Sequence, residues 1–428
     1  MYNIFIFGMG YVGLTFGVYA SKSNKVIGIE NNPIAAKNIT DKNISIVDAG
    51  IAEGLANAID SNDLVIVNSI DDVQNLELHN RNVFVITPGT PLKQDGSVDL
   101  SSINSITEKI KSHIKDGDLI LLRSTVKVGV TEEIINEFKM NVHIAFCPER
   151  TVEGVALEEL KRLPQIIGVN NKESYSHIKD FFDHININVN DPVSVKEAEV
   201  AKLLCNSERD LSFALANEIA YICEELKINA SSVINTATKD YPRSNLKKPG
   251  IVGGPCLEKD PYILRESVRS HKFKLLSVSR DVNESIVKQA IVRIKNNITS
   301  NNVRKISILG CAFKGFPITA DIRGSYIYHL KQELEKIFIE STFHYHDFLN
   351  KEVNQQDPSL ECTDCISHAT KDADIIIIQN NHPSYSKLDW ADIDKNSRKS
   401  CLIYDFWNQI DPSQIVYSKY ISLGEGCE

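Results

Sequence analysis

The most chemically informative residue of the sequence is a cysteine, Cys256. It lies in the run Gly253-Gly254-Pro255-Cys256-Leu257-Glu258-Lys259-Asp260-Pro261, after a double-glycine turn and beside a lysine and an aspartate. A reactive thiolate needs a partly open site with polar or positive neighbours, whereas a structural cysteine packs among apolar side chains. The run therefore indicates a reactive thiol, of the kind that can hold an aldehyde.

The first thirty residues have the pattern of a dinucleotide-binding unit. A strand-like run from Tyr2 to Phe7 leads into Gly8-Met9-Gly10-Tyr11-Val12-Gly13, a helix-like stretch through Ser21 follows, and a second strand from Lys25 to Ile29 ends on Glu30. In such a unit the first glycine permits the tight turn, the second lets the pyrophosphate approach the backbone, and the third lets helix and strand pack closely.

This turn predicts a cofactor site formed by Gly8, Gly10, Tyr11, Val12 and Gly13. The amino terminus of the following helix supplies backbone amides and a positive dipole for the phosphates. Glu30 would accept a hydrogen bond from a ribose 2′-hydroxyl and repel a 2′-phosphate, so NAD is favoured over NADP. A hydride acceptor and an aldehyde-holding thiol together could take an alcohol to an acid.

Elements that would position these groups follow along the chain. Strand-like runs at 64–68, 83–87, 119–122 and 142–146 alternate with helical segments, as a parallel, doubly wound α/β sheet requires. Ligands bind at the carboxyl ends of such strands. Polar loops at these ends are Thr87-Pro88-Gly89-Thr90-Pro91, Arg123-Ser124-Thr125-Val126 and Cys147-Pro148-Glu149-Arg150-Thr151-Val152-Glu153-Gly154.

A long helix is predicted from Ser194 to Leu226, because this stretch contains neither Gly nor Pro. Such a helix can bridge two domains or form a dimer seam. Lys202 and Asn206 are four residues apart and share one face of it. On helix geometry alone, a solvated lysine and an asparagine without function are the more common case.

A second α/β unit begins near Ser300. Strands are expected at 304–309, 343–347, 375–379 and 401–405, and a helix at 325–334. The turn from Gly310 to Gly315 lacks the full glycine triplet, so we do not expect it to bind a second NAD. It carries Lys314, which could hold a nucleotide phosphate together with backbone amides.

Composition narrows the class of protein. The 428 residues are 42% hydrophobic and 24% charged, which is typical of a folded protein of two or three domains. The net charge of −9 and a pI near 5.7 argue against nucleic-acid and anionic-membrane partners, which attract basic surfaces. Residues 1–20 lack the basic leader of an export signal.

Cysteine usage points to a reducing compartment. Nine cysteines scattered over a long chain fit reduced thiols better than a disulfide framework, so we expect a cytoplasmic protein. The pair Cys362 and Cys365 forms a lone CxxC without a second pair or a histidine at ligand spacing. We interpret it as a coincidence at the surface and expect no metal site.

Taken together, these motifs resemble the UDP-glucose/GDP-mannose dehydrogenases, four-electron nucleotide-sugar 6-dehydrogenases. The similarity extends over nearly the whole chain. It rests on Gly8 to Gly13, Asp95-Gly96 with Asp99-Leu100, Ser124-Thr125-Val126, Pro148-Glu149-Arg150, Ala198-Glu199 with Lys202 and Asn206, Gly253 to Asp260, Ala312-Phe313-Lys314 and Asp321-Ile322-Arg323.

The resemblance implies a fold and a domain division. The expected fold is α/β, with two Rossmann-like doubly wound domains joined by a long central helix and a helical dimerisation region. Residues 1–192 would bind NAD, residues 193–300 would form the central dimerisation domain with the Cys256 loop, and residues 301–428 would bind the UDP-sugar.

The same resemblance implies a role for each site residue. Cys256 would be the nucleophile that forms a thiohemiacetal and then a thioester. Lys202 and Asn206 would stabilise the oxyanion at C6. The remaining catalytic residues would act on water and on thioester hydrolysis, with no single carboxylate identified as the base: Asp260, Thr125, Glu149 and Glu153.

Further residues would bind the cofactor and the substrate. Thr87, Pro88 and Thr125 complete the cofactor site. Glu149, Arg150, Lys202, Asn206 and Gly253 would contact the sugar, while Lys314 and Arg323 would bind the nucleotide part. Arg243 matches an arginine that in relatives reaches the neighbouring subunit's sugar nucleotide, which implies a homodimer.

The sugar is indicated by Arg150. Family members that act on glucose or GDP-mannose typically have Pro-Glu-Phe where this chain has Pro148-Glu149-Arg150. The arginine form resembles the branch acting on UDP-N-acetylhexosamines, so UDP-N-acetylmannosamine is the preferred substrate and its glucosamine epimer a possible one. Departures from the family pattern at Pro255 and Glu258 concern this sugar preference and leave the redox chemistry intact.

Three alternatives remain open at this point. One is a UDP-glucose 6-dehydrogenase. Another is a two-electron dehydrogenase of the hydroxyacid type, which needs no thiol. The third is an inactive nucleotide-sugar-binding protein, which would contain the site residues but produce no NADH.

Overall fold

The computed structural model describes residues 1–75, 81–268, 274–299 and 302–426. It divides into two compact units, one of Met1–Cys205 with Tyr262–Ser270 and the other of Asn206–Pro261 with His271–Glu428. The boundary falls within one long helix. The finer division at residues 192 and 300 stays a prediction.

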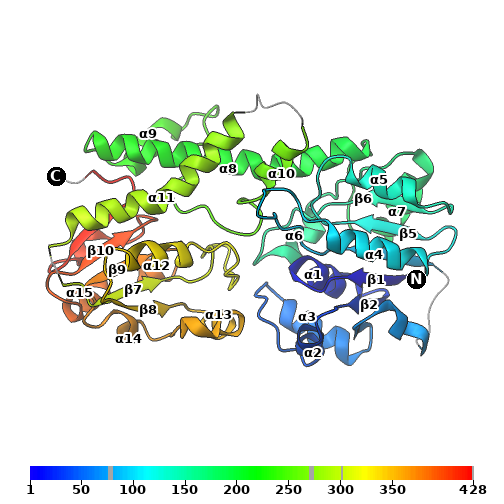
Figure 1. The fold of residues 1–428 in the computed structure, drawn as a ribbon, viewed down its shortest axis with the longest axis horizontal. Coiled ribbons are helices and arrows are strands. Elements are labelled where there is room, and N and C mark those ends of the chain that lie inside the picture. Colours follow the sequence, from blue (N-terminus) through cyan, green and yellow to red (C-terminus); the bar gives the residue numbers. More distant parts are fainter. Residues whose placement is uncertain (76–80, 269–273, 300–301, 427–428) are drawn as a thin grey trace. The chain divides into compact units, whose positions relative to one another are not determined.

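The first unit is built on a parallel six-stranded sheet in the order β3-β2-β1-β4-β5-β6 (Figure 1). This is the strand order of a dinucleotide-binding Rossmann domain. Its strands are β1 (Asn3–Phe7), β2 (Lys25–Ile29), β3 (Leu64–Val67), β4 (Asn82–Ile86), β5 (Leu119–Leu122) and β6 (His143–Phe146). Its helices are α1 (Tyr11–Ala20), α2 (Pro33–Thr40), α3 (Ile51–Asp60), α4 (Ser101–Lys111), α5 (Val130–Glu137), α6 (Ala156–Arg162) and α7 (Lys172–His184), with a short 3-10 helix η1 (Ile70–Asn75).

Alternating side chains of the strands form two cores, one on each face of this sheet. On β1, Ile4 and Ile6 pack into a cluster with side chains of α1, α3 and α7. Phe5 and Phe7 point the other way and pack with side chains of α4 and α5. Because successive residues of a strand face opposite sides, an almost continuous apolar strand is what a sheet covered on both faces requires.

The central helix is α8 (Val195–Glu225). Ser194 and Glu197 form a capping box at its start, where Ser194 Oγ lies 2.6 Å from a Glu197 carboxylate oxygen and the Glu197 amide donates to Ser194 Oγ. At its end Lys227 has a left-handed φ of 57°, and the Ile228 amide donates to the Cys223 carbonyl. The helix predicted at 194–226 is thus confirmed.

The second unit contains a parallel five-stranded sheet in the order β11-β10-β9-β7-β8 (Figure 1). Read from β8, this is the other common doubly wound order, in which ligands bind where the order reverses between the first and third strands, here β7 and β9. The strands are β7 (Lys305–Leu309), β8 (Thr342–His346), β9 (Ile375–Ile378), β10 (Leu402–Asp405) and β11 (Lys419–Ser422).

Along the chain, the helices of the second unit precede its sheet or connect its strands. They are α9 (Ala230–Thr238), α10 (Asp260–Glu266, which ends in the first unit), α11 (Leu275–Asn297), α12 (Ile327–Glu335), α13 (Asn350–Gln356), α14 (Ile366–Thr370) and α15 (Trp390–Asn396), with 3-10 helices η2 (Pro358–Leu360), η3 (Tyr385–Lys387) and η4 (Pro412–Gln414). The expected α/β fold with two Rossmann-like domains and a long central helix is confirmed. Sequence patterns missed α11 and β11.

Candidate active site

The glycine turn follows β1 and is locked by a threonine after β4. Thr87 Oγ1 lies 2.6 Å from the Gly8 carbonyl oxygen and 2.8 Å from that of Phe7. Gly8 has a φ of +89°, and a Cβ on Gly13 would lie 1.9 Å from the Gly8 carbonyl oxygen, so neither position admits a side chain. The turn can therefore form only with glycine at both positions.

The residues of this turn fit a dinucleotide. A Cβ placed on Gly10 would meet nothing within 4 Å, and α1 begins there without a side-chain cap. The first amides of α1 thus face open space, where a pyrophosphate would be bound. Glu30 lies beside the turn, because its Oε2 accepts a 3.0 Å hydrogen bond from the Met9 amide. A carboxylate in this position suits a ribose hydroxyl.

Tyr11 of the turn reaches a loop that follows β6. Its hydroxyl donates a short hydrogen bond to Asp48 and accepts one of 3.0 Å from the Gly154 amide. Asp48 also accepts hydrogen bonds from the amides of Gly154, Ala156 and Leu157. Burial, followed by Asp48, raises the pKa of Tyr11, so the phenol stays protonated. This bond ties the loop of Glu153 to the glycine turn.

Glu149 is held in the same loop by a buried arginine. Its carboxylate pairs with Arg123, whose side chain is fully buried, and accepts hydrogen bonds of 2.8 and 2.9 Å from the amides of Arg150 and Thr151. Burial alone would raise the pKa of Glu149, but Arg123 and the two amides outweigh it and hold the pKa below its usual range. Glu149 is therefore an ionised, weakly basic carboxylate.

Arg123 itself was not predicted as a site residue. Its guanidinium also donates a 2.8 Å hydrogen bond to Gln165 and stacks over the Phe16 ring at 4.5 Å. The signal that could have identified it is an arginine at the end of an apolar strand, next to the predicted Ser124-Thr125 loop. In that loop, the Thr125 carbonyl accepts a 2.5 Å hydrogen bond from Thr90. In the loop after β6, Arg150 donates a hydrogen bond to the Pro164 carbonyl.

The central helix carries two polar side chains one turn apart, and both are buried. Lys202 is 7% exposed. Asn206 is also 7% exposed, and its Nδ2 donates a 2.6 Å hydrogen bond to Oδ2 of Asp260. The structure therefore brings Asn206 and Asp260 together in the second unit, whereas Lys202 belongs to the first.

The Cys256 loop turns directly into Asp260. The amides of Lys259 and Asp260 donate hydrogen bonds of 3.2 and 3.0 Å to the Cys256 carbonyl, and Lys259 Nζ lies 3.1 Å from Oδ1 of the fully buried Asp260. The Cys256 side chain is exposed. The exposed Cys256 thiol lies two residues before half-buried Glu258 and four residues before Asp260, whose carboxylate accepts a hydrogen bond from Asn206. This setting is compatible with a nucleophile.

Glycines pack this loop against the turns of the second sheet. A Cβ on Gly254, whose φ is +101°, would lie 2.6 Å from the Phe313 ring, and one on Gly253 would lie 2.3 Å from the Gly324 carbonyl oxygen. The Gly254 amide donates to that same carbonyl at 3.0 Å. The motif segments around Phe313 and Gly324 thus support the cysteine loop.

Three predicted substrate-binding cations have different settings. Lys314 follows β7, at the reversal point of the sheet, where the neighbouring Gly315 amide donates 2.8 Å to Asn381 Oδ1 after β9. Arg323 is exposed and pairs with Asp321. Arg243 is exposed and lies over the Tyr241 ring at 4.7 Å. Their roles in binding a ligand stay predictions.

The interpretation of the CxxC pair as a surface feature was wrong for one of its members. Cys362 is only 4% exposed, and its sulfur lies 3.5 Å from that of buried Cys311. Cys362 follows η2, and its backbone amide donates a 2.8 Å hydrogen bond to Asn354 Oδ1, which holds the residue in the interior. Cys365 is exposed as expected.

No helix within the described ranges is long and apolar enough to cross a membrane.

Comparisons with known proteins agree with these features. Three family models match the chain in order: the UDP-glucose/GDP-mannose dehydrogenase family NAD binding domain over residues 2–186, the central domain over 196–285 and the UDP binding domain over 307–412. A UDP-N-acetyl-D-mannosamine dehydrogenase of Methanocaldococcus jannaschii is 30% identical over 401 residues, covering 91% of this chain and 88% of that protein.

Two solved structures resemble the whole chain. The UDP-D-ManNAc dehydrogenase of Pyrococcus horikoshii is 25% identical, with a TM-score of 0.87 and 99% of each chain covered. The UDP-N-acetyl-mannosamine dehydrogenase of Staphylococcus aureus is 27% identical, with a TM-score of 0.82 and coverage of 99% of this chain and 98% of that one.

Proposed function

The chain belongs to the UDP-glucose/GDP-mannose dehydrogenase family, and on that premise we propose that it oxidises the C6 hydroxyl of a UDP-N-acetylhexosamine to the carboxylic acid in two NAD-dependent steps. The observation that carries the proposal is the exposed Cys256 in a loop that ends on the buried Asn206–Asp260 pair. A two-electron dehydrogenase would not need such a thiol.

NAD, when bound at the glycine turn, would accept the hydride removed in each oxidation. Between the two, the Cys256 sulfur would add to the C6 aldehyde and form a thiohemiacetal, with its proton passing to solvent or a neighbouring base. The second oxidation turns this adduct into a thioester, which water hydrolyses to the acid and the thiol. Each sugar thus consumes one water and releases two hydrides.

Polar groups around the sulfur would handle the charge that develops at C6. Lys202 and Asn206 would donate to the oxyanion, since an ammonium and an amide N–H on one helix face can point at the same atom. Asp260 is fixed by Asn206 and Lys259 and would orient the attacking water, with Thr125 as a second partner. Because Arg123 keeps Glu149 weakly basic, we assign Glu149 to substrate holding rather than to proton abstraction.

The sugar class follows from two independent features. By the resemblance, Arg150 stands where family members that act on glucose or GDP-mannose typically have phenylalanine. The relatives described above are named as dehydrogenases of UDP-N-acetylmannosamine. We therefore prefer UDP-N-acetylmannosamine, with the glucosamine epimer second. The product would be a uronic acid sugar nucleotide for surface polysaccharide synthesis. The nucleotide part would lie at the reversal point of the second sheet, with Lys314 and Arg323 as its cations.

We further propose a homodimer formed through α8. Four of its exposed apolar residues recur at intervals of seven and four, which places them on one stripe of the helix: Leu204, Leu211, Leu215 and Ile222. An apolar stripe with this period is typical of a helix that packs against another helix. Arg243 would then reach the partner's substrate.

The substrate assignment is tested with purified enzyme, NAD and separate sugar nucleotides: UDP-N-acetylmannosamine, UDP-N-acetylglucosamine, UDP-glucose and GDP-mannose. We expect the acid of the first, identified by mass spectrometry, to form with the highest kcat/KM. Acid formation from UDP-glucose alone would contradict the assignment.

The dimer is tested by sedimentation of the wild-type protein and of Leu215→Lys, which puts a charge in the middle of the stripe. We expect a dimer that the substitution dissociates, with Leu275→Lys, an exposed leucine on α11, as the control. A wild-type monomer would contradict the proposal.

A further inference from the structure

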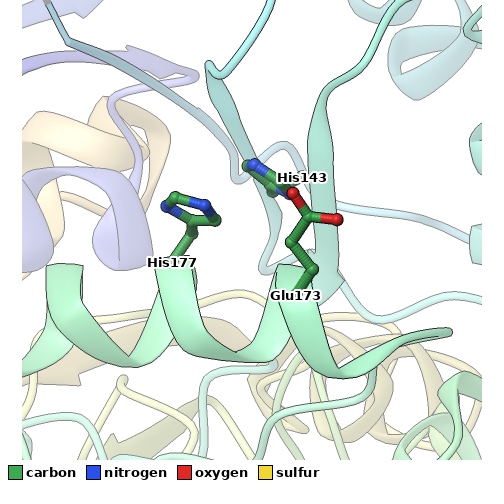
Figure 2. A group of neighbouring side chains, drawn as sticks. All are labelled: His143, Glu173 and His177. Carbon is green, nitrogen blue, oxygen red and sulfur yellow. The ribbon is translucent and has the colours of Figure 1, made fainter.

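Two histidines and a glutamate converge where β6 meets α7. His143 begins β6 and is 3% exposed, while Glu173 and His177 are exposed and lie four residues apart on α7. One nitrogen or carboxylate oxygen from each lies within 4.8 Å of the others. Figure 2 shows Glu173 and His177 projecting from adjacent turns of α7 toward His143 on the strand.

This cluster lies apart from the glycine turn within the first unit. The glycine turn follows the carboxyl end of β1, whereas His143 stands at the amino end of β6 in the same parallel sheet. The two sites therefore lie at opposite ends of the parallel strands. None of the three residues has a role in the proposed oxidation.

We propose that His143, Glu173 and His177 bind a first-row transition-metal cation, for which Zn²⁺ is the best match. Zinc prefers imidazole nitrogen and carboxylate oxygen, and many of its sites have three protein ligands with water in the fourth position. Magnesium and calcium prefer oxygen ligands and would find only one here. Exposure of Glu173 and His177 gives the ion a path from solvent.

The protein holds the two elements in place without a metal. The inner face of α7 packs against the sheet through Ile178, Phe181 and Phe182, which are fully buried in the core on one side of the sheet. Asn171 caps the helix by accepting a 2.8 Å hydrogen bond from the Ser174 amide. Glu173 and His177 are therefore kept beside His143 by packing, and only their side chains need to adjust.

That adjustment is small. Ligands about 2.0–2.1 Å from a tetrahedral zinc ion are about 3.3 Å from one another. The three ligand atoms must therefore approach by up to roughly 1.5 Å from their present separation. Rotation about the side-chain bonds of two exposed residues provides this movement, while buried His143 serves as the fixed ligand.

The protonation state of the buried ligand is suitable. Burial, followed by the proximity of His177, lowers the pKa of His143, so the imidazole is neutral at pH 7, as metal binding requires. The rings of His143 and His177 are stacked, with centroids 4.1 Å apart. Nδ1 of His143 lies 3.3 Å from Ser174 Oγ. A proton on Nδ1 that is shared with Ser174 would leave the lone pair of Nε2 for the metal.

The test uses the full-length protein without a histidine tag, stripped with a chelator and titrated with ZnCl₂ by calorimetry. Exposed thiols also bind zinc, so the informative quantity is the difference in stoichiometry between variants. We expect His177→Ala and Glu173→Gln each to bind one equivalent fewer than the wild type. His329→Ala, an exposed helical histidine elsewhere, and Asp180→Asn, an exposed acid on α7, should retain the wild-type stoichiometry.

Two further readouts separate this site from the thiols. Co²⁺ in place of Zn²⁺ should give a visible absorption band that His177→Ala loses, without loss of the near-ultraviolet bands that cobalt–thiolate bonds produce. Saturating Zn²⁺ should raise the thermal midpoint of the wild type by on the order of 5 °C, and that of His177→Ala by less, because the ion cross-links α7 to β6. Equal stoichiometry, spectra and midpoints in the wild type and both ligand variants would overturn the proposal.

Discussion

Asn206 donates from Nδ2 to Oδ2 of Asp260 at 2.6 Å, and this bond joins the central helix to the first residue of α10, directly after the Cys256 loop. Both side chains are buried, so the amide and the carboxylate each depend on the other as a polar partner. The bond fixes the loop relative to the helix face on which an oxyanion would be stabilised.

Replacing Asn206 should therefore impair the chemical step more than substrate binding. We expect Asn206→Ala to lower kcat by about 10²- to 10³-fold, the usual cost of one oxyanion donor, with a smaller change in KM. Steady-state kinetics with UDP-N-acetylmannosamine measure this, and Asn235→Ala, an exposed asparagine on α9, is the control. A kcat within threefold of the wild type would rule out the oxyanion role.

Glu30 should determine the affinity for NAD and its selection over NADP. Removing the carboxylate in Glu30→Ala takes away its bond to Met9 and a charged acceptor for the ribose, so we expect the KM for NAD to rise roughly 10- to 100-fold. The preference for NAD over NADP should fall in parallel, because the repulsion of a 2′-phosphate is lost. Glu53→Ala, an exposed acid on α3, serves as the matched control. Unchanged KM values for both cofactors would contradict this role.

The Arg123–Glu149 pair should matter for stability. Arg123→Met leaves an ionised carboxylate buried without its partner, so we expect a loss of about 3–5 kcal/mol in the free energy of unfolding of the first unit, measured by denaturant titration at pH 7. The double variant with Glu149→Gln should recover part of the loss, because no buried charge remains.

The pH dependence of this pair has a definite sign. Because the pKa of Glu149 is lower in the folded protein than in the unfolded chain, its contribution is present above the ordinary carboxylate pKa and is lost as the pH falls through the folded value. If the effects of Arg123→Met and Glu149→Gln on the free energy of unfolding were additive in the double variant, the Arg123–Glu149 pair would contribute nothing to stability.

Glu258 should have the opposite dependence. Burial, partly offset by Arg280, raises the pKa of Glu258 to about 7, so this carboxyl ionises at a lower pH in the unfolded chain than in the folded protein. Wild-type stability should therefore decline relative to Glu258→Gln as the pH rises from about 4.5 to about 7, by up to about 3 kcal/mol, and the difference should be constant above that range. Thermal midpoints of both proteins measured across pH 4.5–8.5 test this. A difference that is independent of pH would contradict the raised pKa.

Local patterns were sufficient for much of the fold. The strands of the first sheet are short apolar runs bounded by turn residues, and the segment that forms α8 contains neither Gly nor Pro. These local patterns identified both. Strand β11, Lys419–Ser422, has a lysine and a serine at its ends and only one edge paired, which gives little signal. Its place in the sheet depends on β10, a tertiary partner that the sequence does not display.

The site was predictable where a motif is contiguous. Gly8 to Gly13 and the Cys256 loop could be identified because their residues are neighbours in the chain. Arg123 and Asp48 could not, because their partners, Glu149 and Tyr11, are 26 and 37 residues away in the chain. The inward position of Cys362 likewise depends on contacts with Cys311 and Asn354 that form only in the fold.

The number of NADH molecules formed per sugar nucleotide consumed tests the four-electron mechanism most directly. With limiting UDP-N-acetylmannosamine and excess NAD, the wild type should form two NADH, measured by absorbance, for each molecule of acid. The Cys256→Ser variant should form acid far more slowly than the wild type. One NADH per sugar, or a Cys256→Ser variant that still makes the acid at the wild-type rate, would contradict the role of Cys256.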